Sequence, residues 1–177
     1  MNTNKQTVEH HPFEAFIPKN AKVLILGSFP GAEQTGNPDK EHLRQYEWFY
    51  GAARNKFWHI MEAVYSTPLK TKTDKQQLFE KAGIAITDII SSAIRKEGKN
   101  VDSNLIIEKF NDDIIKKIIN SNKIETIFFT SKFVEGHFKK LFPAYTNCEY
   151  LPSPSPLYFR MKMETKIAIY KEKLPKL

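Results

Sequence analysis

Four groups of residues with polar side chains or accessible amides stand where apolar runs end. The run Lys22-Val23-Leu24-Ile25-Leu26 leads into Gly27-Ser28-Phe29-Pro30-Gly31, a turn whose glycines let backbone amides approach a ligand closely. Asp88 stands near the end of a second run and could polarise a water molecule. Thr130-Ser131 follows a third run, and Pro152-Ser153-Pro154-Ser155-Pro156 follows a fourth. The plainer interpretation of the first turn is an ordinary connection after the first strand of an α/β domain.

Strands and helices alternate along the predicted chain. Apolar runs predict strands over residues 22–26, 84–90, 123–129 and 147–151. Apolar residues at helical spacing predict helices over 55–65, 73–81 and 102–122, after Ser131, and from near Met161. This alternation predicts an α/β fold of three layers, α/β/α, with a central, mainly parallel four-stranded sheet. Ligands of such sheets bind beyond the carboxyl ends of the strands, so the four groups should line one edge.

The composition favours a single domain, which we expect to span residues 1–177. Hydrophobic residues make up 41% of the chain and charged residues 27%. Residues 1–11 are polar and are expected to form a loose leader in which His10-His11 is solvated. The apolar residues of 12–16 could pin this leader to the body. Residues 32–47 are expected to form a long surface loop.

Charge and cysteine content restrict the partners and cofactors. The net charge is 27 − 20 = +7 and the pI about 9.3, which favours an anionic partner, with nucleic acid the first candidate. Cys148 is the only cysteine, which excludes an internal disulfide and a thiolate metal cluster. The histidines lack the spacing of metal ligands, and we expect no metal and no cofactor.

No apolar run approaches the ~18 residues of a membrane span, and there is no signal-peptide core. We therefore expect a cytoplasmic protein without a membrane partner.

Three stretches together resemble the uracil-DNA glycosylase superfamily. Gly27-Ser28-Phe29-Pro30-Gly31 resembles its first motif, a glycine-proline loop after the first strand. Tyr50-Gly51-Ala52-Ala53-Arg54-Asn55-Lys56-Phe57-Trp58 resembles a segment of the mismatch-specific and hypoxanthine-DNA glycosylase branches. Leu151-Pro152-Ser153-Pro154-Ser155-Pro156-Leu157 resembles the second motif, the loop that presses into DNA, and residues 83–89 resemble the strand between. The matching pieces occur in the family's order from about residue 22 to 160.

Two positions depart from the best-known branches of that superfamily. In those branches the third residue of the first motif is Asp or Asn, which acts on the attacking water. In this chain the third residue is Phe29. The second motif begins with His in the most active branch, where the present chain has Leu151. Residue 29 has no carboxylate or amide, and Asn55 stands before Phe57-Trp58. In these two respects the chain looks most like the hypoxanthine-DNA glycosylase branch. Thr130-Ser131 stands where relatives often carry Asn-Gly, so the resemblance leaves the preferred base open.

The resemblance implies roles for residues around a flipped base. Asn55 would orient water towards the sugar, and Asp88 would polarise water or contact the base. Tyr50 would stack on the base, a contact worth ~1–3 kcal/mol. The remaining base-binding residues would be Gly27, Ser28, Phe29, Pro30, Thr130 and Ser131, with the Ser28 and Phe29 amides stabilising charge on the departing base. Three plainer interpretations remain: Asn55 as a helix cap, Tyr50 as core packing, and Asp88 as an acceptor of loop amides.

The second motif would contact the DNA backbone and fill the vacated stack. Leu157 is the candidate wedge, and Pro152, Pro154 and Pro156 would stiffen the loop before it binds. Ser153 and Ser155 could hold phosphates, and Arg160 could neutralise one. The alternative is a plain proline-rich connector.

The resemblance implies a monofunctional DNA glycosylase acting on double-stranded DNA that contains a damaged or mismatched base. Hypoxanthine is the favoured base and uracil the next, and we expect a monomer. A non-catalytic binder of damaged or single-stranded DNA on the same fold is the main alternative. A nucleotide-binding α/β protein unrelated to DNA is a third.

Overall fold

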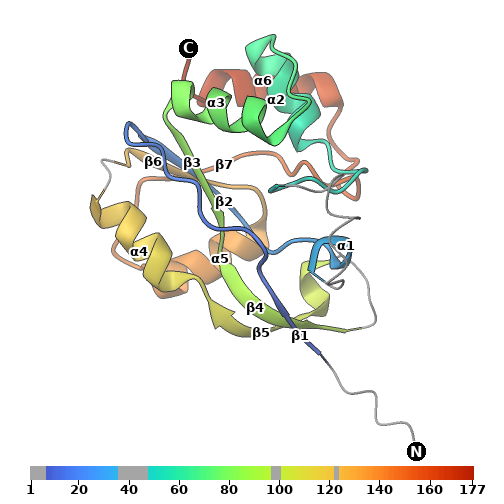
Figure 1. The fold of residues 1–177 in the computed structure, drawn as a ribbon, viewed down its shortest axis with the longest axis vertical. Coiled ribbons are helices and arrows are strands. Elements are labelled where there is room, and N and C mark those ends of the chain that lie inside the picture. The colour runs from blue at the N-terminus through green and yellow to red at the C-terminus, as the bar shows by residue number, and fades with distance from the viewer. Residues whose placement is uncertain (1–6, 36–47, 97–100, 122–123) are drawn as a thin grey trace, which may run out of the picture.

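Four parallel strands form the central sheet of the computed structural model, which describes residues 7–35, 48–96, 101–121 and 124–177 (Figure 1). They are β2 (Val23–Gly27), β3 (Ile84–Asp88), β6 (Thr126–Phe129) and β7 (Cys148–Tyr150). Their order in the sheet is β3-β2-β6-β7, and every residue of β2 and β3 is buried. Strands covered on both faces read as continuous apolar runs, and the prediction of a mainly parallel four-stranded sheet is confirmed.

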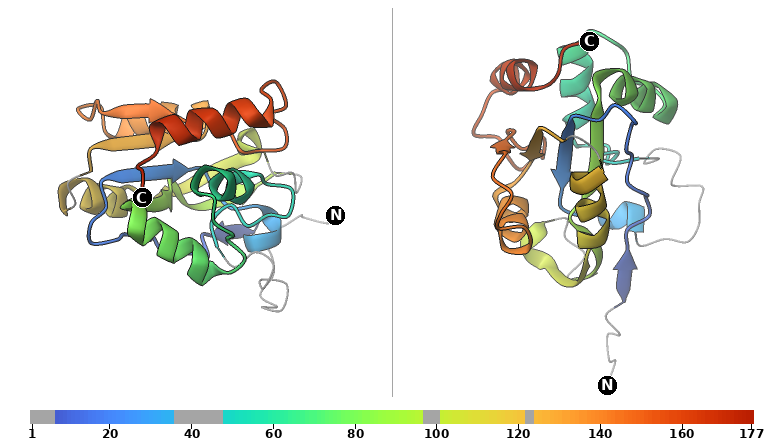
Figure 2. Two further views of the ribbon diagram at one scale, coloured as in Figure 1. Left: turned by 90° about the horizontal axis from the view of Figure 1, so that it is seen from above. Right: turned by 90° about the vertical axis from the view of Figure 1, so that its left-hand side faces the viewer.

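Helices cover both faces of this sheet (Figures 1 and 2). On one side lie α2 (Phe57–Tyr65), α3 (Lys72–Ala82) and α6 (Met163–Lys173), which pack with Val23 and Ile25. On the other side lie α4 (Asp112–Ser121) and α5 (Lys132–Leu141), which pack with Leu24 and Leu26. Alternate residues of β2 thus enter two separate cores, as expected for the predicted three-layer α/β/α fold. The short helix α1 (Ala32–Thr35) begins the predicted surface loop, whose residues 36–47 lie outside the described part of the chain.

A second sheet of three antiparallel strands adjoins the first and was not predicted. It comprises β1 (Val8–His10), β4 (Ile90–Arg95) and β5 (Leu105–Phe110), in the order β1-β4-β5. The helix predicted over 102–122 is therefore wrong in its first half, where a 3-10 turn, Asp102–Asn104, precedes β5. Leu105, Ile106 and Phe110 fit a helical face by spacing, but these residues pair with β4. Tertiary pairing overrides local spacing here.

The segment that precedes the central sheet is paired with β4 from Val8 onward. β1 pairs with β4 from Val8 to His10, and the side chain of His11 is only 8% exposed. The prediction that this stretch is loose is therefore wrong from Val8 to His11, because β1 pairs with β4. The prediction that the pair is solvated is wrong for the buried His11 but holds for His10, which is exposed. Residues 1–6 lie outside the described part. Phe13 and Phe16 pack against the core, which confirms that this segment is pinned to the body.

Aromatic side chains fix the segment between α1 and α2. Trp48 stacks on Trp58, with ring centroids 5.5 Å apart and an interplanar angle of 18°. The Trp58 indole N–H donates to the Phe49 carbonyl over 2.7 Å. Both tryptophans and Phe49 are buried, so the backbone that carries Tyr50 is held rigidly beside the sheet.

Candidate active site

The carboxyl ends of the parallel strands gather most of the predicted groups at one edge. In the sheet register Gly27 of β2 lies opposite Asp88 of β3. Thr130 follows β6, and Leu151, which follows β7, donates its N–H to the Phe129 carbonyl over 2.9 Å. Leu151 is fully buried. The position where the most active branch carries a histidine is therefore part of the core in this protein.

Gly27 is the point where two side chains converge. A Cβ atom built on Gly27 would overlap Oδ1 of Asp88 and lie 2.6 Å from the Tyr50 hydroxyl oxygen. Both separations are much shorter than van der Waals contact between a carbon and an oxygen atom. Glycine is thus required here for close approach, and it brings a carboxylate and a phenol together at the end of β2.

Tyr50 is held by three constraints. Its hydroxyl lies 2.9 Å from Oγ1 of Thr130, and its ring stacks on Phe57 at 4.2 Å between centroids. Its φ of 55° places a non-glycine residue in the left-handed region, which is uncommon and is found at functional positions. Burial, and secondly the charge of Asp88, raise the pKa of Tyr50 well above its usual value, so the phenol stays neutral. Phe57 covers one face of the ring, and Tyr50 packs against the core on this side of the sheet.

Asp88 is paired with a histidine that sequence reasoning placed in solvent. Nε2 of His11 lies 2.9 Å from Oδ2 of Asp88, and the two side chains are 8% and 9% exposed. Phe13, Phe29 and Phe49 surround the imidazole, with ring centroids 5.8, 5.9 and 5.4 Å from it. No local signal could have predicted this contact, because the partners are 77 positions apart.

Asp102 is a second carboxylate at this edge that the sequence did not single out. It begins the 3-10 turn before β5, and the hydroxyls of Ser28 and Ser131 hydrogen-bond to it. Burial raises its pKa above the usual value, and the nearby charge of Asp88 acts in the same direction, whereas the two hydroxyls lower it. The predicted base-binding residues Ser28 and Ser131 therefore face a carboxylate. Ser131 also caps α5, accepting the Val134 N–H over 3.2 Å.

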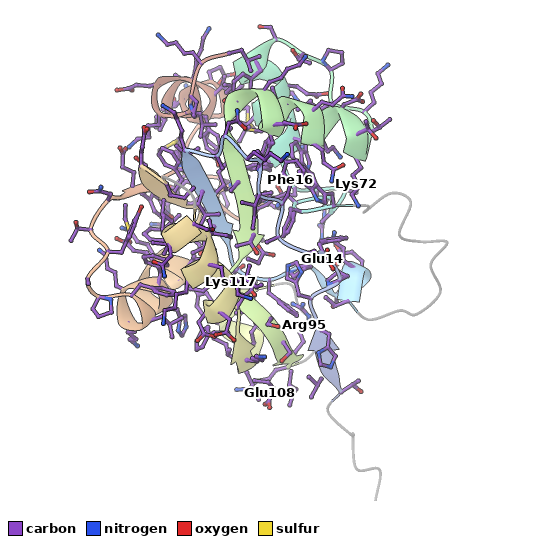
Figure 3. All side chains as sticks on the ribbon, turned by 60° about the vertical axis from the view of Figure 1, so that its left-hand side comes forward. Glu14, Phe16, Lys72, Arg95, Glu108 and Lys117 are labelled. Atoms are coloured by element: carbon purple, nitrogen blue, oxygen red, sulfur yellow. The ribbon has the colours of Figure 1, made fainter. Side chains whose placement is uncertain are left out.

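Arg95 holds the turn after β2 in place. It belongs to β4, the strand of the second sheet that pairs with β1 (Figure 3). Its Nη2 donates to the Pro30 carbonyl over 2.7 Å and to Glu9 over 3.0 Å. The guanidinium also lies over the Phe29 ring, 5.8 Å from its centroid. Phe29 and Pro30 are thus fixed by an ion-paired arginine whose side chain is 4% exposed.

Asn55 stands one residue before Lys56, the N-cap of α2, and its side chain satisfies a first-turn amide of that helix. Its side-chain oxygen accepts the Phe57 N–H over 2.9 Å, and the next residue, Lys56, donates its N–H to the Pro154 carbonyl over 3.0 Å. The first bond supports the capping interpretation. The second joins the segment carrying Asn55 to the predicted DNA-binding loop, so these two motifs are neighbours.

The loop of the second motif is anchored at its base and exposed at its tip. Pro152 and Pro154 are buried, and Tyr170 of α6 donates to the Pro152 carbonyl over 2.9 Å. Ser153 and Ser155 accept the N–H groups of Ser155 and Leu157, each over 3.2 Å. Large apolar side chains are presented outward: Leu157 is 63% exposed and Phe159 85%. Arg160 is also exposed. Sequence reasoning singled out Leu157 and Arg160 but missed Phe159.

Lys166 of α6 supports the same loop from beneath. Its ammonium group donates to the carbonyls of Ser153 and Tyr158 over 2.9 and 2.8 Å. The residue is 3% exposed, and burial lowers its pKa. A buried lysine that satisfies two loop carbonyls fixes the shape of the loop.

Among the residues that the structure describes, no group of three or more His, Cys, Asp or Glu side chains could hold a metal ion. None of the helices within those ranges has the length and apolarity to cross a membrane.

The three-layer fold, with a glycine-proline turn at the carboxyl edge of its sheet, defines a protein of the uracil-DNA glycosylase type. The family model of the Uracil DNA glycosylase superfamily matches residues 14–175, and the chain belongs to this superfamily of hydrolytic DNA glycosylases. A solution NMR structure from Methanosarcina acetivorans, described as that of a candidate uracil DNA glycosylase, has the same fold. The two share a TM-score of 0.69 and 21% sequence identity, over 94% of this chain and 98% of the other.

Proposed function

We propose that this protein is a monofunctional DNA glycosylase that removes a deaminated base, hypoxanthine first and uracil second, from double-stranded DNA. The observation that carries the proposal is the convergence of Asp88 and Tyr50 on Gly27. The absence of a carboxylate or amide at Phe29, and the presence of Asn55 before Phe57-Trp58, favour the hypoxanthine-DNA glycosylase branch over the uracil-specific ones. All the proposed groups come from one chain, so a monomer suffices.

The reaction begins with extrusion of the nucleotide, because a duplex hides the bond between base and sugar. Extrusion costs about a few kcal/mol. The exposed Leu157 side chain fills the vacated stack and offsets part of that cost. The hydroxyls of Ser153 and Ser155 accept loop amides, yet each retains its own hydrogen to donate to a phosphate oxygen.

The flipped base then enters the edge beside Gly27. The Tyr50 ring stacks on it, and the Ser28 and Phe29 amides bind its carbonyl oxygen as negative charge develops. Asn55 orients a water molecule towards the cation-like sugar carbon, and Asp88 accepts its proton. No lysine in the matched motifs is placed to form a Schiff base, so we expect base release without strand cleavage.

A panel of defined duplexes tests the proposed reaction. Oligonucleotides carrying hypoxanthine, uracil, xanthine or a thymine mismatch are incubated with the protein, and abasic sites are revealed by alkali. We expect release of hypoxanthine, or failing that of uracil, and intact strands before alkali treatment. Binding of these duplexes without release of any base would contradict the enzyme proposal.

A non-catalytic DNA binder is the second candidate, favoured by one observation. Two positions that carry chemistry in active branches are occupied by Phe29 and by the fully buried Leu151. Under this alternative the same duplexes bind with similar affinity whether or not Asn55 is intact, and none loses its base.

Substitutions of Asn55 separate catalysis from helix capping. Asn55→Asp keeps an oxygen acceptor for the Phe57 N–H, whereas Asn55→Ala loses it and about 1 kcal/mol of stability. If the side-chain amide positions water, both variants lose turnover while DNA affinity is largely kept. Unchanged turnover in Asn55→Ala removes Asn55 from the mechanism.

A further inference from the structure

We infer that His11 is a positioning residue of the active site, which holds the Asp88 carboxylate so that its Oδ1 atom faces the reacting water beside Gly27. The inference rests on the proposed function. It concerns a residue upstream of residues 14–175, the part matched by the family model. Membership of the superfamily therefore assigns His11 no role.

The hydrogen bonds around the imidazole fix which nitrogen faces Asp88. Nδ1 of His11 lies 3.1 Å from the Phe13 N–H donor and 2.9 Å from the Phe13 carbonyl oxygen. In the neutral ring, Nδ1 accepts the Phe13 N–H and the proton resides on Nε2; in the charged ring, Nδ1–H donates to the Phe13 carbonyl. In either state an Nε2–H points at Oδ2 of the ionised Asp88, 2.9 Å away.

The surroundings make this pair rigid. Phe13, Phe29 and Phe49 enclose the imidazole on several sides, and both partner side chains are more than nine-tenths buried. A carboxylate that is shielded from water in this way needs a hydrogen-bonding partner. His11 supplies it, and its backbone is tied down as well, since its N–H donates to the Ser91 carbonyl over 2.9 Å.

The two oxygens of Asp88 thereby have different environments. Oδ2 is bound by His11, while Oδ1 occupies the space that a Cβ atom on Gly27 would take, on the side where Tyr50 also approaches. Oδ1 is the oxygen that faces the predicted position of the base. Without His11 the carboxylate could rotate about its Cβ–Cγ bond, and neither oxygen would be fixed.

In the proposed hydrolysis a new bond forms between the water oxygen and the sugar C1′ atom while the bond from C1′ to the base nitrogen breaks. The electron pair of the broken bond leaves with the base, which takes up a proton from solvent. The proton of the attacking water passes to Oδ1 of Asp88 and later returns to solvent. His11 does not touch the reacting atoms and acts only through Asp88.

Two substitutions at His11 test this role. His11→Gln places an amide N–H near the position of Nε2, whereas His11→Phe keeps the aromatic packing and removes the donor. His10→Gln is the matched control, since His10 is the exposed neighbour on β1. The single-turnover rate is measured on the duplex that the wild type cleaves best, and affinity on a duplex with a tetrahydrofuran abasic-site analogue.

The positioning role predicts a rate effect without an affinity effect. We expect His11→Phe to lower the single-turnover rate by more than tenfold and His11→Gln by less than threefold, with affinity within about twofold for both. Combining His11→Phe with Asp88→Asn should add little to the loss from Asp88→Asn alone, because both changes act on one group.

The outcomes distinguish this inference from the proposed function. An active wild type together with a fully active His11→Phe overturns the inference and leaves the function intact. A wild type that releases no base overturns the function, and the inference with it. Equal losses of rate and affinity in both His11 variants, with a lowered melting temperature, would show a purely structural role and also overturn the inference.

Discussion

At the scale of single residues, Gly27 sets how close Asp88 and Tyr50 can come to the backbone of β2. We expect Gly27→Ala to displace one or both side chains, to destabilise the protein by about 1–3 kcal/mol, as overpacking does, and to abolish turnover. Thermal unfolding and base release measure the two effects. Gly136→Ala is the matched control: Gly136 lies in α5 with nothing within 4 Å of an added Cβ. That variant should be slightly more stable and fully active.

The carboxylate of Asp102 should carry a stability penalty at neutral pH. Burial raises its pKa above the ordinary value, so between pH 3.8 and that raised pKa the folded state binds more protons than the unfolded state. Stability therefore falls as the pH rises through this window, and the penalty is complete above it. We expect Asp102→Asn to raise the melting temperature at pH 7 relative to wild type, and to raise it less at pH 4.

The same substitution should lower base release if Asp102 orients the Ser28 and Ser131 hydroxyls. A variant that is stabilised yet impaired would mark Asp102 as a residue kept for function. An equal change in melting temperature at both pH values would contradict the burial argument.

The residues that sequence reasoning could place are those that end strands. Asp88 stands near the end of one apolar run and Thr130 follows another, so the rule for parallel sheets puts them at one edge. His11 and Asp102 could not be placed, because each reaches the edge through the second sheet. Pairing of β1 with β4 brings in His11, and pairing of β5 with β4 brings in the turn that holds Asp102.

At the scale of elements, α6 holds the loop of the second motif through Lys166. Replacing it by methionine keeps the length of the side chain and removes two hydrogen bonds to loop carbonyls. We expect Lys166→Met to lower the affinity for duplex DNA by about tenfold, because the loop must then be ordered on binding. Lys171→Met, at an exposed position of the same helix, is the control and should leave affinity unchanged. Equal affinity in both variants, measured by fluorescence anisotropy, would remove the support role of Lys166.

The elements that could be predicted are those for which one local sequence signal was enough to identify a helix or a strand. The strands of the central sheet and helices α2, α3 and α5 follow from apolar runs, from spacing and from turn residues such as Gly83, whose φ of 66° ends α3. The strand predicted over 84–90 is in fact divided at Ile89, whose N–H donates to the Gly27 carbonyl. Antiparallel pairing of β4 and β5 depends on contacts that local spacing does not encode.

At the scale of the whole molecule, the charge of +7 predicts salt-dependent binding. We expect the affinity for duplex DNA to fall steeply with rising salt as phosphate counterions are released. Arg160→Gln should weaken binding to all duplexes alike and reduce the slope of log affinity against log salt by about 1. The control is Lys22→Gln, because Lys22 precedes β2 at the opposite edge of the sheet. An unchanged slope in Arg160→Gln would exclude a phosphate contact by Arg160.

The stacked pair Trp48 and Trp58 gives this protein a built-in optical reporter. They are its only two tryptophans, and they bracket the segment that carries Tyr50 and Asn55. Intrinsic emission of an unlabelled sample should therefore respond when a nucleobase settles against that segment. Stopped-flow mixing could then time the arrival of the base separately from its release.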